Sequence, residues 1–138
     1  MAEPFETYRG VVFANELDHI GHMNVRFYMA KFDEANWQFF AAVGLDGTYL
    51  RESGFGMGAV RHVVEYKREL FAGDVVVVRS HVAEVTERKV RAMHRMYHAL
   101  TGVEVASLEN LAVHFDRNAH KSSPFPPAIY DKLAALVS

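Results

Sequence analysis

Residues 24–44 read NVRFYMAKFDEANWQFFAAVG. The apolar side chains of this stretch recur at the spacing of one face of an α-helix. Asn24 is a suitable N-cap, and Gly44 is suited to ending the helix in the left-handed conformation. The stretch therefore predicts one long amphipathic helix over about residues 23–43, with one face that must be buried. The apolar positions are Val25, Tyr28, Met29, Phe32, Ala35, Phe39, Ala42 and Val43.

The segments on both sides of this helix have the pattern of β-strands. Residues 5–14 suit a first strand, and we expect the glycine-rich segment 45–58 to be a loop that can include a short helical turn. Thr101-Gly102 is typical of a hairpin tip. Period-two patterns predict four long antiparallel strands. We also expect a short helix at the end of the chain. These segments are 59–70, 74–86, 88–100 and 103–116, and then 128–137.

One long helix and about five strands favour an α+β fold in a single domain over residues 1–138. The apolar stripe of the helix is buried most simply if a curved antiparallel sheet wraps around it. Such a sheet keeps an open edge or face, which a second copy of the chain can cover. We therefore expect a homodimer or homotetramer.

Composition excludes several functional classes. The net charge is -2, which does not favour binding to nucleic acid. The chain has no cysteine, so disulfides and thiolate chemistry are excluded. The N-terminal segment MAEPFETYRG lacks the features of a signal peptide, and no stretch is apolar enough for a membrane span. We expect a cytoplasmic protein with no membrane partner.

The densest polar cluster, ELDHIGHMN at residues 16–24, directly precedes the long helix. The first N–H groups of a helix have no partner within it and carry partial positive charge, so they can stabilise an oxyanion. A carboxylate beside them can attack a carbonyl carbon or deprotonate a water molecule that does so. Asp18 and the start of the helix therefore provide two requirements of acyl hydrolysis, which are a base or nucleophile and an oxyanion hole.

The run Leu17-Asp18-His19-Ile20-Gly21-His22-Met23-Asn24, with Tyr28 four positions later, resembles the signature of hotdog-fold acyl-CoA thioesterases of the 4-hydroxybenzoyl-CoA thioesterase type. The later segment from Glu65-Tyr66 to Ala72-Gly73-Asp74 is similar to that family's second strand and following turn. The resemblance covers nearly the whole chain. It implies a hotdog fold and the hydrolysis of an acyl-CoA, or of an acyl carrier protein thioester, without a cofactor or a metal ion.

The resemblance also implies roles for individual residues. Asp18 matches the catalytic nucleophile or general base, and the backbone N–H of Val25 matches the group that polarises the thioester carbonyl. Gly21, His22 and Asn24 match residues that shape the loop. The cluster Arg88-Lys89-Arg91 falls where related enzymes hold the phosphates of coenzyme A. The predicted substrate-binding residues are Tyr28, Arg61, His62, Arg88, Lys89 and Arg91.

The chain also departs from the family pattern. Val25 stands where many members have a second Asn, and His19 has no assigned role. A second hotdog subgroup places its carboxylate on the helix after a His-Gly-Gly run, which is absent here, so Asp33 and Glu34 are expected to be solvent-facing charges. An enoyl-CoA hydratase and a non-catalytic acyl-CoA-binding domain remain the alternatives.

Overall fold

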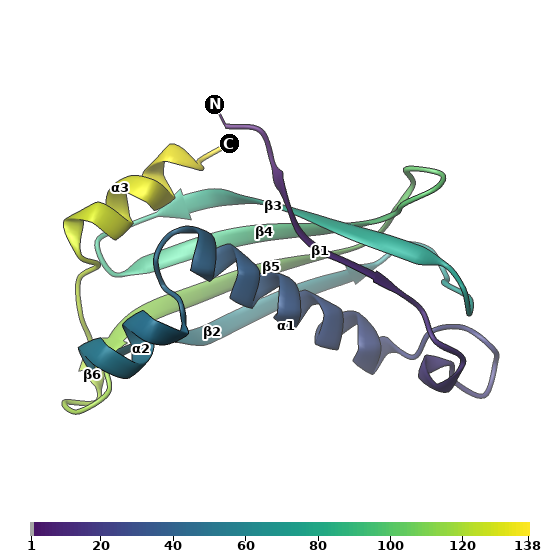
Figure 1. Ribbon diagram of the computed structural model, residues 1–138, viewed down its shortest axis with the longest axis horizontal. Helices are drawn as coiled ribbons and strands as arrows, with labels where there is room; N and C mark the ends of the chain where they lie inside the picture. The colour runs from purple at the N-terminus through teal and green to yellow at the C-terminus, as the bar shows by residue number, and fades with distance from the viewer. Residues whose placement is uncertain (1) are drawn as a thin grey trace.

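The computed structural model describes residues 2–138, which form one antiparallel sheet and three α-helices. The strand order is β1-β3-β4-β5-β2, and β6 pairs with the end of β5. Figure 1 shows the sheet curving around α1, which lies across its concave face. The predicted hotdog architecture is therefore confirmed. The elements are β1 (Phe5–Val11), a 3-10 turn (Ala14–Glu16), α1 (Val25–Ala42), α2 (Gly47–Ser53), β2 (Phe55–Tyr66), β3 (Val75–Val85), β4 (Lys89–His98), β5 (Glu104–Asp116), β6 (Lys121–Ser122) and α3 (Pro127–Ala135).

The apolar face of α1 is the centre of the core, as its spacing predicted. Phe32 and Ala35 are fully buried in one cluster with Val78 and Met96 of the sheet. Phe39, also fully buried, belongs to a second cluster toward the end of the helix. Burying a phenylalanine side chain contributes about 1.5–3 kcal/mol, so these residues fix the helix on the sheet.

Both ends of α1 lie at the predicted capping residues. The Oδ1 atom of Asn24 accepts a hydrogen bond from the Arg26 N–H at 3.1 Å. Gly44 follows the helix with a φ of 95°, which favours glycine. The helix therefore begins and ends where these two residues stand.

In the glycine-rich segment 45–58, the short helical turn that the sequence allowed is a helix of seven residues, and the start of a strand follows it. Residues Gly47–Ser53 form α2, whose N-cap Asp46 accepts a hydrogen bond from the Tyr49 N–H at 2.8 Å. Phe55 then begins β2, so this strand covers 55–66 and not the predicted 59–70.

Two glycines inside β2 explain why its start was missed. An ideal Cβ at Gly56 would lie 3.2 Å from the ring of Phe115 on the neighbouring strand, and one at Gly58 would lie 3.5 Å from it. These glycines are therefore places where an aromatic ring packs closely on the backbone, and not breaks in the strand.

The other strands agree with the sequence apart from their ends. Gly102 has a φ of 75° at the predicted hairpin tip between β4 and β5. β1 ends at Val11 and not at 14, because the chain turns into a 3-10 segment in which Glu16 accepts a hydrogen bond from the Phe13 N–H at 2.8 Å. The two-residue β6 follows β5 and pairs with its end.

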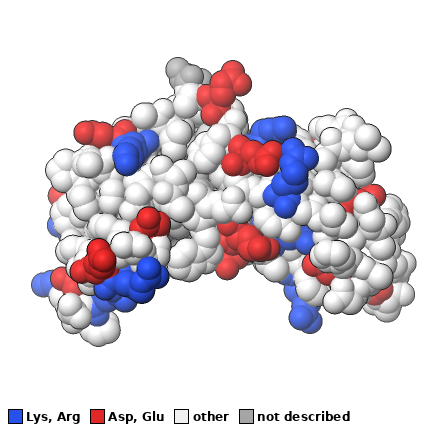
Figure 2. All heavy atoms as spheres, in the orientation of Figure 1, with Lys and Arg blue, Asp and Glu red and all other residues white. Residues whose placement is uncertain are grey.

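β2 forms one edge of the sheet, and its second half is exposed. Val60 is 55% exposed, Val63 37% and Tyr66 49%, so apolar side chains line an unpaired edge. On the face of the molecule in Figure 2, acidic and basic side chains are intermingled, in agreement with a net charge of -2.

Candidate active site

A cleft of about 470 Å³ opens at the N-terminal end of α1. The loop before the helix, the first turns of the helix and the end of β2 form its walls. Four residues that the sequence predicted for the site meet here, namely Asp18, His22, Val25 and Tyr28. The full lining is Asp18, His22, Met23, Val25, Tyr28, Tyr66, Lys67, Arg68 and Glu69.

Asp18 lies in a tight turn of the loop that precedes α1. Its backbone N–H donates to the carbonyl of His22 at 2.8 Å, and the Gly21 N–H donates to the carbonyl of Asp18 at 3.1 Å. Gly21 has a φ of 95° and open space around the position of a Cβ atom. Glycine is therefore required here for its backbone angle, and steric room plays no part.

Backbone donors also hold the carboxylate of Asp18. Its Oδ1 accepts hydrogen bonds from the N–H groups of Ile20 at 2.8 Å and His22 at 3.4 Å. The Ile20 bond is the main reason that the pKa of the Asp18 carboxyl lies below its ordinary value of 3.8. The group is therefore ionised at neutral pH. Within residues 2–138 its Oδ2 atom accepts no hydrogen bond, so it is free to meet a substrate or a water molecule.

The Asp18 loop is tied to the turn between β2 and β3 at several points. The N–H of Val12 donates to the carbonyl of Asp74 at 2.9 Å, and the N–H of Gly73 donates back to Val12 at 2.8 Å. The N–H of Met23 donates to the carbonyl of Leu70 at 2.8 Å. Both ends of the loop are thus fixed to the sheet.

A buried ion pair joins the same loop to α1. Lys31 is only 4% exposed, and its Nζ atom donates to both carboxylate oxygens of Glu16 at 3.2 Å. The backbone carbonyl of Glu16 also accepts a hydrogen bond from the Asn24 N–H at 2.8 Å. Glu16 therefore links the start of the loop, its end and the second turn of the helix.

The N-terminus of α1 presents an unpaired donor to the cleft. Asn24 caps the N–H of Arg26, and the carbonyl of Asn24 accepts from Phe27 at 2.9 Å. The N–H of Val25 has no acceptor within the described part of the chain, and Val25 is 57% exposed. An amide at this position carries the positive end of the helix dipole.

Tyr28 and His22 are held by contacts inside the cleft wall. The Tyr28 hydroxyl donates to the carbonyl of Arg68 at 3.0 Å, and burial raises its pKa to about 12. The Nε2 atom of His22 lies 3.3 Å from a carboxylate oxygen of Glu69, and its ring packs edge-on against Phe71. Both side chains therefore already have partners other than a substrate.

The structure does not place the remaining predicted residues at this cleft. Asn24 acts through its cap, while Arg61 and His62 are exposed on β2. Arg61 does not line the cleft, and His62 pairs across the sheet with Asn110, beside a second cavity.

The basic cluster lies at the other end of β3. Arg88 donates to the carbonyl of Ser122 at 2.9 Å, and Arg91 pairs with Glu84 at 3.3 Å. Eleven residues of β3 separate this end from the Asp18 loop, a span of roughly 35 Å at about 3.3 Å per residue. Within one chain, Arg88, Lys89 and Arg91 therefore do not reach the cleft, and their binding of phosphate stays a prediction.

Sequence reasoning missed the cations that do line the cleft. Lys67 pairs with Glu104, whereas the guanidinium of Arg68 donates only to the carbonyl of Lys67, at 3.0 Å, among residues 2–138. The feature of the sequence that could have indicated Lys67 and Arg68 is their position directly after β2, just before the turn that is bonded to the Asp18 loop. Asp33 and Glu34 are exposed, as predicted, but Asp33 also lines the second cavity.

Residues 2–138 contain no group of three His, Cys, Asp or Glu side chains arranged to hold a metal ion. No helix in that range is long and apolar enough to cross a membrane.

Comparison with known proteins decides the family. The family model described as the thioesterase-like superfamily matches residues 12–133. The chain belongs to this family. The thioesterase is 24% identical over 136 residues to the betainyl-CoA thioesterase of Pseudomonas aeruginosa, with 99% of this chain and 86% of that protein covered. It is 25% identical to an L-carnitine dehydrogenase/betainyl-CoA thioesterase of Rhizobium meliloti, of which it covers 24%, or about a quarter of the length.

Solved structures share the fold of the thioesterase. A Staphylococcus aureus protein in complex with CoA superposes with a TM-score of 0.91 at 18% identity, covering 99% of this chain and 85% of that one. A 1,4-dihydroxy-2-naphthoyl-CoA thioesterase from Synechocystis gives 0.84 at 16% identity, covering 97% and 98%. These structures confirm the fold, and the family match over residues 12–133 confirms the resemblance of the motif and the predicted enzyme class, a thioester hydrolase.

Proposed function

We propose that this thioesterase hydrolyses an acyl-CoA to a free acid and coenzyme A, with Asp18 as the reactive carboxylate. The observation that carries the proposal is that one cleft holds an ionised carboxylate and the unpaired Val25 N–H at a helix N-terminus. Hydrolysis of a thioester needs an activated nucleophile and a donor for the oxyanion that develops on the carbonyl.

Two routes use the same residues. As a general base, Asp18 removes a proton from water, the resulting hydroxide attacks the carbonyl carbon, and the proton is returned to the departing thiolate. As a nucleophile, Asp18 forms an anhydride and expels the thiolate, and water then hydrolyses the anhydride. In both routes the Val25 N–H stabilises the negative charge on the former carbonyl oxygen.

Lys67 and Arg68 are the Lys and Arg side chains among the residues that line the cleft. We propose that Arg68, which has no acidic partner among residues 2–138, binds a polar group of the coenzyme A portion. Because the curated relatives are named for betainyl-CoA, that thioester belongs in the first assay panel with short, long and aryl acyl-CoAs.

We also propose that the enzyme is at least a homodimer built on the edge strand β2. An exposed edge with apolar side chains, including Val60 and Val63, favours pairing with another strand. Two copies related by a two-fold axis can pair these edges in antiparallel orientation. If the pairing is centred on the exposed stretch 59–66, Tyr66 lies opposite Ala59 of the partner subunit.

The catalytic role of Asp18 is tested with Asp18→Asn, which keeps the shape of the side chain. We expect kcat to fall by roughly 10³-fold, since loss of a positioned base costs about 10²–10⁴-fold. His19→Gln is the matched control, because His19 is an exposed neighbour outside the cleft lining. Activity of Asp18→Asn near that of the control, with circular dichroism unchanged, would remove Asp18 from the mechanism.

A single turnover in H₂¹⁸O separates the two routes. If Asp18 is the nucleophile and water attacks the Asp18 carbonyl carbon of the anhydride, one oxygen of the carboxylate passes to the first acid product, which then lacks ¹⁸O, and the label enters the enzyme. If Asp18 is a general base, the first product carries the label and the enzyme does not. Attack of water on the acyl carbon of an anhydride gives this same pattern, so label in Asp18 is the result that identifies the nucleophile. Binding of acyl-CoAs with no release of thiol over the whole panel would instead favour a non-catalytic domain.

A further inference from the structure

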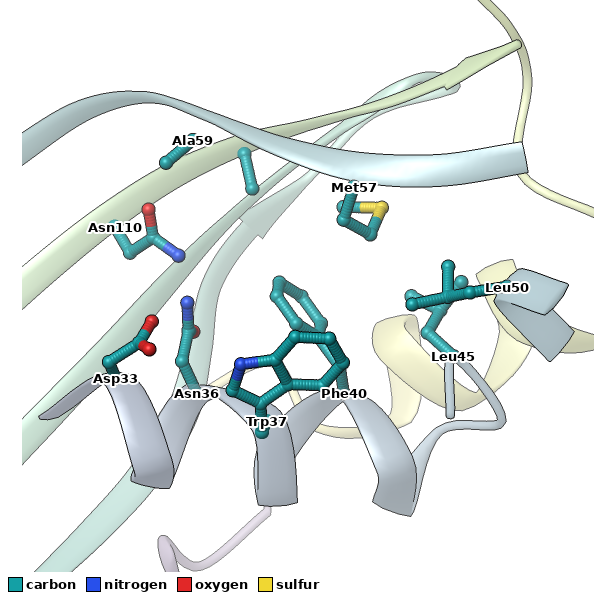
Figure 3. A pocket seen from close by; sticks show the side chains of 10 residues that line it. Asp33, Asn36, Trp37, Phe40, Leu45, Leu50, Met57, Ala59 and Asn110 are labelled. Carbon is teal, nitrogen blue, oxygen red and sulfur yellow. The ribbon is translucent and has the colours of Figure 1, made fainter. Parts of the chain in front are cut away.

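A second cavity, of about 160 Å³, lies between the C-terminal half of α1 and strands β2 and β5. Figure 3 shows a polar end, formed by Asp33, Asn36 and Asn110, and an apolar end toward Leu45 and Leu50. A cavity of roughly 150 Å³ holds a molecule of benzene, so a small acyl group fits in this volume. The mechanism described for Asp18 does not use this cavity.

Asn110 is the unusual residue in the cavity wall. Its side chain is fully buried, and neither Oδ1 nor Nδ2 has a hydrogen-bond partner within residues 2–138. An unpaired buried polar group costs about 1–3 kcal/mol, and most buried amides in proteins have a partner. A residue that lowers stability and faces a cavity indicates a ligand that interacts with it.

Asn36 is fixed by a chain of neutral groups. Its Oδ1 lies 3.0 Å from the Nε2 atom of His94, and the Nδ1 atom of His94 lies within hydrogen-bond distance of the Ser80 hydroxyl. The Ser80 hydroxyl in turn lies 2.7 Å from the hydroxyl of Thr7. Because burial lowers the pKa of His94 to about 3, this imidazole is uncharged at neutral pH and brings no positive charge to the cavity.

Asp33 is the charged residue in the cavity lining, and the exposed His62 lies next to the cavity wall, where it pairs across the sheet with Asn110. The Asp33 carboxylate has no ion-pair partner in the described part of the chain, and no Lys, Arg or His is among the lining residues. The indole of Trp37, which is 53% exposed, lines the same cavity one helical turn after Asp33. A carboxylate next to an indole attracts a cation and repels an anion.

The proposed dimer brings this cavity to the active site. Tyr66 lines the cleft and Ala59 lines the cavity, and a two-fold pairing of β2 places these two residues opposite each other. The carbonyl held at Val25 of one subunit is then next to the cavity of the partner. Within one chain, Val25 and Asp33 are eight residues apart on α1, about 12 Å at 1.5 Å per residue.

We propose that the cavity selects the acyl group and that the preferred acyl group carries a positively charged nitrogen, with Asp33, Trp37 and Asn110 around it. This proposal rests on the proposed thioesterase function and names its substrate class. The Asn110 amide, which no hydrogen bond holds, turns its oxygen toward the cation.

The test uses two substrates that differ in one atom. Betainyl-CoA carries a trimethylammonium group, and 3,3-dimethylbutanoyl-CoA has a neutral carbon in place of the nitrogen. The wild-type enzyme is expected to prefer betainyl-CoA in kcat/KM by at least tenfold. Asp33→Asn should lower that preference roughly tenfold, mainly through KM, and Trp37→Leu should lower it by about threefold.

Glu34→Gln is the matched control, because it removes the same charge from the next position, outside the cavity lining. It should leave the preference as in the wild type. Equal preferences in Asp33→Asn and Glu34→Gln would overturn the proposal. Wild-type preference for the neutral thioester would also overturn it, while leaving thioesterase function intact, and turnover of no thioester in the panel would overturn both.

Asn110→Leu separates a recognition role from a structural role. Replacing the unpaired amide with an apolar group of similar size should raise Tm, while lowering kcat/KM for betainyl-CoA. If Asn110 were needed for packing, Tm would fall instead. A lower Tm together with an unchanged preference for betainyl-CoA would contradict the role proposed for Asn110.

Discussion

Replacing Lys31 with methionine removes the positive end of the ion pair that joins α1 to the Asp18 loop. The methionine side chain has nearly the length of lysine, so packing is largely kept and the charge is lost. Glu16, whose side chain is only 13% exposed, then keeps a negative charge with no cation beside it. The variant therefore measures the contribution of this pair to the scaffold of the active site.

The expected magnitude follows from burial. Breaking a buried pair by removing one partner costs about 3–5 kcal/mol, because the remaining charge is desolvated and unpaired. Glu16 keeps its hydrogen bond from the Phe13 N–H at 2.8 Å, so we expect the lower end of this range. For a chain of 138 residues, 1 kcal/mol corresponds to about 3–5 °C in Tm. Tm should therefore fall by roughly 10 °C.

Calorimetry of the full-length wild type, of Lys31→Met and of the double variant Glu16→Gln/Lys31→Met measures this effect. The double variant leaves no buried charge, so it should regain more than half of the lost Tm. The kcat of both variants should fall, since the Asp18 loop loses its link to the helix. A loss below 3 °C in the single variant, or no recovery in the double variant, would refute the reasoning.

Three further changes test the site and its support. The folded-state pKa of His94 is about 3, below its unfolded value of 6.5. The contribution of the neutral imidazole to stability is therefore complete above pH 6.5 and declines by roughly 1.4 kcal/mol per pH unit as the pH falls. In urea titrations, the free energy of unfolding of His94→Gln should fall less between pH 7 and pH 5 than that of the wild type. Because the pKa of Asp18 is lowered, the acid limb of kcat/KM should lie below pH 3.8, and a limb above pH 5 would contradict its assignment. Gly21→Ala should cost about 1–2 kcal/mol and also lower kcat, whereas Gly73→Ala, at a similar φ of 91°, should affect mainly Tm.

The sequence was sufficient to predict the helix, the sheet around it and the part of the site that is local in the chain. Asp18, Val25 and Tyr28 belong to one loop and one helix, so their spacing alone brings them together. The same holds for Asn24 and Gly44, whose effects act on the neighbouring backbone. Local geometry needs no knowledge of the rest of the fold.

The features that were missed depend on contacts between distant segments. Gly56 was assigned to a loop because only the ring of Phe115, far away in the chain, explains why a side chain is excluded there. Lys67 and Arg68 reach the cleft because their turn is bonded to the loop before α1. Asp33 is exposed, as predicted, but its place in a cavity wall was missed because Asn110 on β5 completes that cavity.

The backbone bonds between the Asp18 loop and the turn after β2 have a consequence for turnover. A carboxylate attached at both ends of its loop to a sheet moves with that sheet, and it does not swing in as a hinged flap would. Acyl-CoA can then enter and the products can leave without waiting for a gate to open, whereas gating limits the rate of many enzymes that close over their substrates. For this enzyme we expect the chemical step, or the release of coenzyme A itself, to limit kcat.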